Sequence, residues 1–319
     1  MVSKGSDSLS PAREVNPRET NFLTTSDGTV ISTKKIVDHG PAALRWNLVV
    51  LGDGYKKTQL VQYRVHVGNF VSHFRATVPF DQLWDAIDVY RVDIASTDSG
   101  ADDPASCGGS GKTARTYLDA SFCHSGIRRL LLVNSRTALS VAIAQVPEMH
   151  SIMVIVNSSV YGGSGGSVAV LSSVPSAREI ALHELGHSAF GLGDEYEYYA
   201  GCGSGESGHD NYVGGEPAQP NITIDTNLAT NKWHNLISPA TLMPTTRNAD
   251  CTQCDRQSSP VPTGTVGAFE GAYYHHCGVY RPEFNCRMRA LGYAFCAPCQ
   301  QTIRQTLAPF VPPNLHSLT

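Results

Sequence analysis

The 319-residue sequence has no apolar run near the ~20 residues that a helix needs to cross a bilayer. Residues 1–20 are polar and lack the apolar core of a signal peptide, so we interpret them as a disordered tail or an expression remnant. An excess of basic residues is also missing, since 24 Lys and Arg are scattered among 28 Asp and Glu. We therefore expect no membrane span and no nucleic-acid partner.

What the sequence has is an ordinary globular composition, 41% hydrophobic and 16% charged, with a net charge of -4. Residues 21–319 are numerous enough to bury a full hydrophobic core. We interpret them as a single domain, with an N-terminal subdomain to about residue 193 and a C-terminal subdomain over about residues 194–319. We expect a monomer.

The chain is organised around the segment 177–199, which contains the pattern H-E-L-G-H at residues 183–187. On an α-helix, residues four apart lie on the same face, so His183 and His187 can reach one ion with Glu184 beside them. Ser176 and Glu179 form a capping-box pattern that predicts the start of this helix. An apolar stripe that can bury its back is made of Ile180, Leu182, Leu185 and Phe190.

A third ligand is expected shortly after this helix. Gly191 and Gly193 can end the helix and turn the chain back, because glycine adopts left-handed backbone conformations without strain. Asp194 or its neighbour Glu195 can then return to the metal. Two histidines and one carboxylate leave a fourth tetrahedral position open, which is typical of a catalytic zinc site.

Short apolar runs that alternate with helical patterns predict an α/β core with a mixed, mostly parallel sheet. The predicted strands are residues 46–51, 87–95, 129–134 and 152–157, and the predicted helices before the metal motif span about 61–74 and 137–145. Asp27 and Gly28, between β-rich flanks, predict a hairpin. Beyond residue 199 we expect an irregular, cysteine-containing region that closes with a helix over about residues 294–307.

Two segments leave alternatives open. The glycine-rich stretch 161–173 is either an edge strand that pairs with an extended peptide substrate or a flexible hairpin. The acidic cluster D-S-G-A-D-D at 98–103 is a solvated loop or, although it lacks regular calcium-loop spacing, a structural Ca²⁺ site.

Nine cysteines are many for a cytosolic enzyme and indicate an oxidising compartment, so we expect a secreted or extracellular protein with disulfides. The odd number leaves at least one thiol unpaired within the chain. Cys251/Cys254 and Cys296/Cys299 form two C-x-x-C pairs. They predict disulfides, with a four-cysteine structural zinc site as the alternative.

Several motifs resemble those of the bacterial IgA-specific metallo-endopeptidases, the IgA peptidase family. They include L-G-D-G-Y at 51–55, Y-G-G-S-G-G at 161–166, H-E-L-G-H-S-A-F-G-L-G-D-E-Y at 183–196 and G-V-Y-R-P-E-F-N-C-R-M-R at 278–289. Together the motifs cover most of residues 44–307. The larger members carry additional β-rich domains, of which this chain has little, so docking to immunoglobulins is not implied.

The resemblance implies an α+β zincin-like domain with one catalytic Zn²⁺ ion, held by His183, His187 and Asp194. It also implies that Glu184 is the general base and that Met288 lies in a turn beneath the metal, with Met243 as the rival methionine.

The activity implied is the hydrolysis of peptide bonds in a protein or peptide substrate. Tyr280 and Tyr196 are the candidate donors to the oxyanion that develops during this reaction. The alternatives are a zinc hydrolase of a non-peptide amide and a protein-binding module without turnover.

Overall fold

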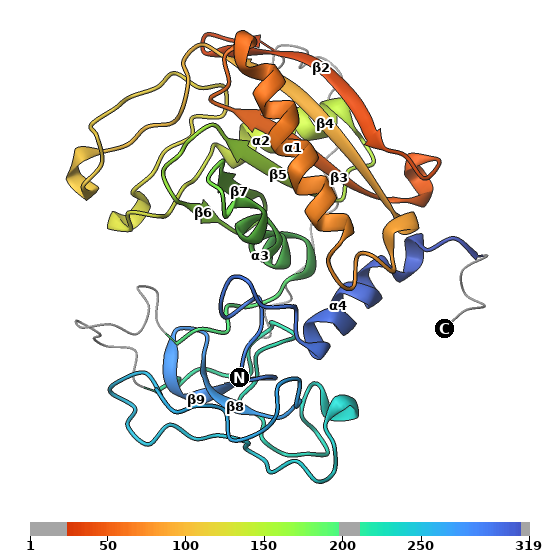
Figure 1. Cartoon of the computed structure of the whole chain (residues 1–319), viewed down its shortest axis with the longest axis vertical. Coiled ribbons are helices and arrows are strands. Elements are labelled where there is room, and N and C mark those ends of the chain that lie inside the picture. The colour runs from red at the N-terminus through yellow and green to blue at the C-terminus, as the bar shows by residue number, and fades with distance from the viewer. Residues whose placement is uncertain (1–23, 198–210, 314–319) are drawn as a thin grey trace, which may run out of the picture.

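The computed structural model describes residues 24–197 and 211–313 (Figure 1). The predicted tail at residues 1–20 lies outside this part of the chain. An upper part holds the large sheet, and a lower part holds a small hairpin among long loops. The helix at residues 177–190 lies in the upper part, facing the lower one (Figure 1).

The large sheet has seven strands in the order β1-β2-β4-β3-β5-β7-β6. They are β1 (Thr24–Thr25), β2 (Gly28–Val37), β3 (Trp46–Asp53), β4 (Ile87–Ser96), β5 (Ser151–Val156), β6 (Gly163–Ser164) and β7 (Ala169–Ser172). The four central strands β4, β3, β5 and β7 are parallel, whereas β2 and β6 pair antiparallel with their neighbours. The predicted α/β fold with a mostly parallel sheet is confirmed.

The strand predicted at residues 129–134 is wrong. This segment forms only isolated bridges, Ser121 with Leu132 and Leu130 with Gly163, and no continuous ladder. Leu131 and Val133 are buried, whereas the other four residues of this segment are half-buried or exposed, and the segment belongs to the long loop after β4. A short apolar run satisfies the pattern of a strand without having a partner along its length.

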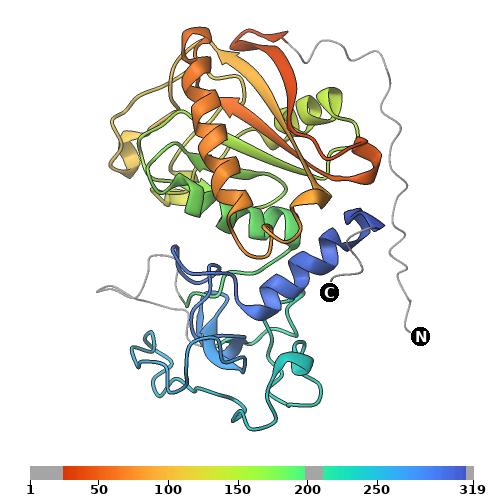
Figure 2. The same cartoon turned by 45° about the vertical axis from the view of Figure 1, so that its right-hand side comes forward.

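Helices cover both faces of the sheet (Figure 2). The first face carries α1 (Leu60–Arg75) and α3 (Ala177–Phe190), and its apolar core extends to α4 (Ala297–Leu307). The second face carries α2 (Ser135–Gln145), which packs on a separate core with residues from the 101–133 loop. The helix predicted at about residues 294–307 is therefore present as α4, and it joins the C-terminal region to the sheet core.

Asp53, the last residue of β3, is fully buried rather than lying in an exposed turn. Its carboxylate accepts hydrogen bonds from the backbone N–H of Leu118 at 2.9 Å and of Ala120 at 3.2 Å, and from the Ser96 hydroxyl at 3.2 Å. Burial raises the pKa of Asp53 to about 6, against these hydrogen bonds. Asp53 thereby fixes the long loop after β4 to the carboxyl end of the sheet.

The C-terminal region is mostly irregular, with the hairpin β8 (Phe269–Ala272) and β9 (His275–Arg281). Its own apolar clusters are small, one around Trp233 and one around Ile222. A disulfide between Cys251 and Cys277 staples the loops to the hairpin. Disulfides stabilise a folded region whose hydrophobic core is too small to stabilise it without them.

The described residues contain disulfides, as predicted, and the structure gives the pairing that the sequence left open. Cys107 pairs with Cys123 and Cys251 with Cys277, and Cys254 is also disulfide-bonded. The zinc site proposed for Cys251, Cys254, Cys296 and Cys299 is therefore wrong, because its first two members have no free thiolate. The cysteine at position 202 lies outside the described residues.

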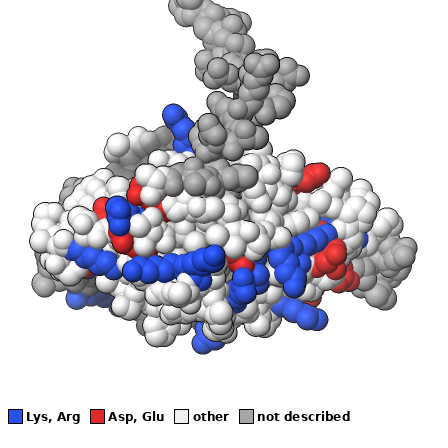
Figure 3. All heavy atoms as spheres, turned by 90° about the horizontal axis from the view of Figure 1, so that it is seen from above, with Lys and Arg blue, Asp and Glu red and all other residues white. Residues whose placement is uncertain are grey.

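Charged residues on the end of the molecule seen in Figure 3 include both signs, with Lys and Arg in a band and Asp and Glu beside them. In the acidic cluster, Asp98 binds Arg115 at 3.0 Å and Asp103 binds Arg128 at 2.7 Å. None of the cation-ligand groups among the described residues includes this cluster, so calcium has no support there. No helix in the described part of the chain is long and apolar enough to cross a membrane.

Candidate active site

The H-E-L-G-H pattern lies on α3, as the spacing predicts. The helix ends at Gly191, whose φ of 64° is left-handed and would strain any residue with a Cβ. The capping box is wrong, because the Ser176 side chain makes no capping hydrogen bond. Glu179 instead binds the guanidinium of Arg287 and lies 3.0 Å from His73 Nε2, which ties the start of α3 to its surroundings.

Three donor atoms converge after the chain turns back. The Oδ1 atom of Asp194 lies 3.0 Å from His183 Nε2 and 3.2 Å from His187 Nε2, and the two Nε2 atoms are 3.2 Å apart. Ligands about 2.05 Å from a tetrahedral zinc ion stand about 3.3 Å from one another. The three donors therefore fit one such ion closely. Glu195, the alternative third ligand, is not part of this group.

Backbone carbonyls fix both imidazoles in the orientation that a metal requires. His183 Nδ1 lies 3.0 Å from the carbonyl oxygen of Arg287, and His187 Nδ1 lies 2.7 Å from that of Leu192. A proton held at each Nδ1 leaves each Nε2 lone pair free for the ion. The Arg287 carbonyl is 104 positions from His183 in the sequence, so the orientation of His183 depends on the tertiary fold.

Tyr274 is a functional candidate that the sequence analysis missed. Its hydroxyl donates a hydrogen bond to the second carboxylate oxygen of Asp194, Oδ2, and so orients Oδ1 toward the histidines. The residue comes from the turn between β8 and β9, about eighty positions from its partner in the sequence. No local motif marks it.

Burial and neighbouring charges shift the pKa values of Glu184, His183 and Asp194. Burial raises the pKa of Glu184, although the neighbouring histidines oppose the shift. Burial alone would lower the pKa of His183, but the hydrogen bond to Asp194 and the charge of Glu184 raise it to about 9. The same imidazoles hold the pKa of Asp194 well below its usual range despite its burial. A buried carboxyl group with a raised pKa is suited to accepting a proton near neutral pH.

A cavity of about 550 Å³ opens onto the donors. Its lining includes Glu184, both histidines, Asp194, Arg129, the segment 163–166, Tyr196 and Tyr274. Tyr196 is thus brought to the site. Tyr280 is not among the lining residues, and its hydroxyl donates to Glu270 Oε1 at 3.2 Å.

Met288 lies beneath the helix, with its sulfur 2.6 Å from the position that a Cβ on Gly186 would occupy. It is fully buried in the core that contains α3. Met243 packs instead in the small cluster around Trp233. Of the two methionines weighed from the sequence, Met288 is therefore the one in contact with the H-E-L-G-H helix.

Two imidazoles and a carboxylate around one point, with a buried glutamate and an open cavity beside them, form the arrangement of a metal-dependent peptidase. The family model of IgA peptidase M64 matches residues 34–259 and 247–307 of the chain. The chain belongs to this family and is a metallo-endopeptidase, a hydrolase that acts on peptide bonds. A search of curated proteins found no match.

Proposed function

We propose that the protein is a zinc-dependent endopeptidase with a zincin-type catalytic domain, in which His183, His187 and Asp194 hold the ion. The observation that carries the proposal is the convergence of their three donor atoms, 3.0–3.2 Å apart, in residues that line the cavity. When bound there, zinc would polarise the scissile carbonyl and lower the pKa of a water molecule toward about 7.

Glu184 is the proposed general base. Its carboxylate takes a proton from the attacking water and delivers it to the leaving amine. Only 8% of the residue is exposed, so few solvent molecules compete for the proton. Gly163 permits this placement, because a Cβ there would lie 3.1 Å from Glu184 Oε1.

Tyr196 is the proposed donor to the developing oxyanion. It lines the cavity next to the ligand Asp194, and its hydroxyl interacts with Arg129 and Asp194. Burial raises the pKa of Tyr196, so the phenol keeps its proton and can donate it in a hydrogen bond. Tyr280, which points to Glu270, receives no role in the reaction.

The proposed substrate is an extended peptide that lies along segment 163–166. This segment begins in β6, which lies at the end of the strand order, and it lines the cavity beside His187. Leu130 already bridges Gly163, so the proposed pairing with the peptide uses residues 164–166. Gly165 allows the backbone to approach, since a Cβ there would be 2.6 Å from the His187 Cβ. A strand edge recognises peptide backbone rather than one side chain, which favours a peptide over the alternative of a non-peptide amide.

We further propose that the protein acts outside the cell as a monomer. The disulfides Cys107–Cys123 and Cys251–Cys277 support an oxidising compartment. Nothing in the cavity identifies IgA as the substrate.

The test is proteolysis of unfolded casein with the purified chain. A zinc chelator should abolish cleavage, and added Zn²⁺ should restore it. Glu184→Gln should retain zinc by elemental analysis and lose at least about 100-fold in kcat, the usual contribution of a general base. Glu148→Gln, at an exposed glutamate, is the matched control. Casein cleavage by the Glu184→Gln protein at the wild-type rate would refute the role of Glu184. A wild-type protein that binds zinc but cleaves no casein would favour the binding-module alternative.

A further inference from the structure

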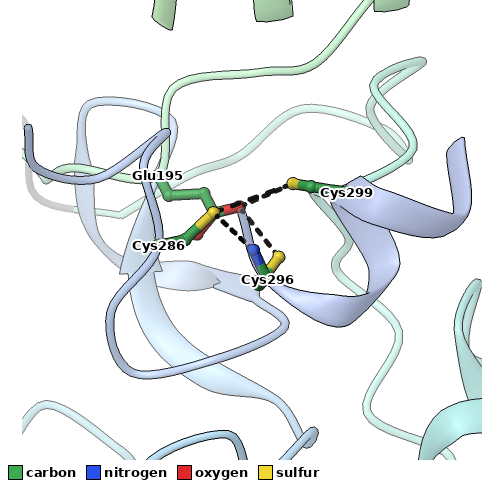
Figure 4. A group of neighbouring side chains, drawn as sticks. All are labelled: Glu195, Cys286, Cys296 and Cys299. Atoms are coloured by element: carbon green, nitrogen blue, oxygen red, sulfur yellow. Dashed lines mark hydrogen bonds between the residues drawn. The ribbon is translucent and has the colours of Figure 1, made fainter. Parts of the chain in front are cut away.

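A second group of side chains of the types that bind metal ions lies in the protein interior, separate from the candidate active site. It consists of Glu195, Cys286, Cys296 and Cys299, whose side chains point toward one another (Figure 4). All four residues are at most 2% exposed. They come from the segment after α3, from the turn that contains Met288, and from the start of α4.

The spacing of the donor atoms fits a tetrahedral zinc ion. The sulfurs of Cys286 and Cys299 are 3.8 Å apart, and Glu195 Oε1 lies 3.4 Å from the sulfur of Cys299 and 3.8 Å from that of Cys296. With Zn–S bonds of about 2.3 Å and a Zn–O bond of about 2.0 Å, tetrahedral geometry gives about 3.8 Å between sulfurs and about 3.5 Å between sulfur and oxygen.

The polar groups around the cluster are arranged for charged ligands. The Asn221 side chain donates to Glu195 Oε1 at 2.8 Å, and the backbone N–H of Cys296 donates to the Cys286 sulfur at 3.3 Å. The other oxygen of Glu195, Oε2, is buried and makes no hydrogen bond to any described residue. A buried carboxylate left in this state is costly unless a cation is present.

A disulfide does not account for the three cysteines. Cys286, Cys296 and Cys299 are free thiols, and the 3.8 Å between two of their sulfurs contrasts with 2.05 Å in the Cys251–Cys277 bond. Pairing any two would leave the third thiol buried against Glu195. The other described cysteines are all in disulfides, whereas these three are free.

We propose that Glu195, Cys286, Cys296 and Cys299 bind a structural zinc ion. All four tetrahedral positions are supplied by the protein, which is the mark of a structural rather than a catalytic site. The buried guanidinium of Arg281 contributes positive charge near Glu195 and offsets part of the negative charge of the ligands.

The ion would fasten together the parts of the fold that shape the active site. Glu195 adjoins the ligand Asp194, and its backbone N–H donates to the carbonyl of Met288 at 2.9 Å. Cys286 begins the turn that carries Met288 and the Arg287 carbonyl that orients His183. One ion would therefore hold Asp194, the turn that contains Met288, and α4 in fixed positions relative to one another.

Elemental analysis of the full chain, purified with Zn²⁺ present, tests the site directly. We expect about two zinc ions per chain, one for each four-coordinate site. His183→Ala/His187→Ala should lose activity and retain about one ion, whereas Glu195→Gln, which preserves side-chain volume, should lower the retained zinc. A double-histidine variant without zinc overturns the cysteine site, while a wild type that holds one ion and cleaves no casein refutes only the active-site assignment.

A second measurement leaves the four cluster residues unchanged, so its result does not depend on whether a cluster variant folds. Co²⁺ alone, added to the metal-free His183→Ala/His187→Ala protein, should give a thiolate-to-cobalt charge-transfer band in the near ultraviolet. Alkylation after denaturation with chelator, read by peptide mass spectrometry, should label Cys286, Cys296 and Cys299. Absence of the band, or a disulfide between any two of these cysteines in native protein, overturns the proposal.

Discussion

The sulfur of Met288 lies directly against the backbone of Gly186, where a Cβ would be only 2.6 Å from it. Gly186 is the fourth residue of H-E-L-G-H and is not among the residues that line the cavity. The helix that carries His183 and His187 thus packs against a side chain from the C-terminal region. A glycine at this position is explained by packing, not by helix formation.

Gly186→Ala should therefore disturb the site. The added methyl group must displace Met288 or α3, and overpacking of this kind costs about 1–3 kcal/mol of unfolding free energy. We expect a loss of that size in chemical denaturation, together with weaker zinc binding in a chelator competition.

Gly68→Ala is the matched control for this substitution. Gly68 also lies inside a helix, α1, but nothing is within 4 Å of the position of its Cβ. Alanine should stabilise that helix by up to about 1 kcal/mol. Equal effects of the two substitutions would show that Met288 does not constrain α3.

Tyr274→Phe should weaken metal binding without removing a ligand. The phenol holds Asp194 Oδ2, and loss of such a supporting hydrogen bond typically lowers metal affinity about 10–100-fold. Competition with a zinc chelator measures the change. Tyr273→Phe is the control, because its ring stacks on Tyr274 with centroids 5.8 Å apart and the substitution retains that ring. A Tyr274→Phe protein with wild-type zinc affinity would show that Asp194 needs no support from this residue.

The features that the sequence predicted well are local. His183 and His187 share a helix face because of the helical period, with Glu184 beside them, and Gly191 ends that helix because of its backbone freedom. The partners that the sequence did not predict are distant along the chain. Tyr274 meets Asp194, and Cys286 meets Cys299, only through the tertiary fold.

The cysteines show this limit most clearly. The C-x-x-C spacing of residues 296 and 299 predicted disulfides, whereas both residues are free thiols at the start of α4. It could not indicate that Cys286 and Glu195 complete the group, while Cys251 joins Cys277 instead. A strand prediction failed at residues 129–134 for the same reason, because pairing depends on a partner strand elsewhere in the chain.

Tyr196→Phe and Tyr280→Phe should separate the two tyrosines proposed from the sequence. Removal of an oxyanion donor lowers kcat about 10²–10³-fold, so Tyr196→Phe should show a loss of this order with zinc content unchanged. Tyr280→Phe should leave kcat near the wild-type value, because its hydroxyl binds Glu270 away from the cavity. Casein or peptide cleavage under saturating substrate measures both. The reverse ranking would transfer the role to Tyr280.

The buried carboxyl group of Asp53 should make the free energy of unfolding depend on pH, independently of the metal. Its pKa in the folded protein is about 6, raised by burial from the ordinary value of 3.8. Between these values the unfolded chain releases the proton before the folded protein does, so stability should fall as pH rises through this window. The difference corresponds to about 3 kcal/mol of unfolding free energy.

Asp53→Asn removes this titration, so the variant should not show this part of the fall in stability between pH 4 and pH 7. Urea unfolding at a series of pH values, with both proteins zinc-loaded, gives the two curves, and their difference isolates Asp53 from other titrating groups. We expect the wild type to lose stability relative to the variant as pH rises. If it gains stability instead, the hydrogen bonds from Leu118, Ala120 and Ser96 outweigh burial and hold the pKa of Asp53 below its ordinary value.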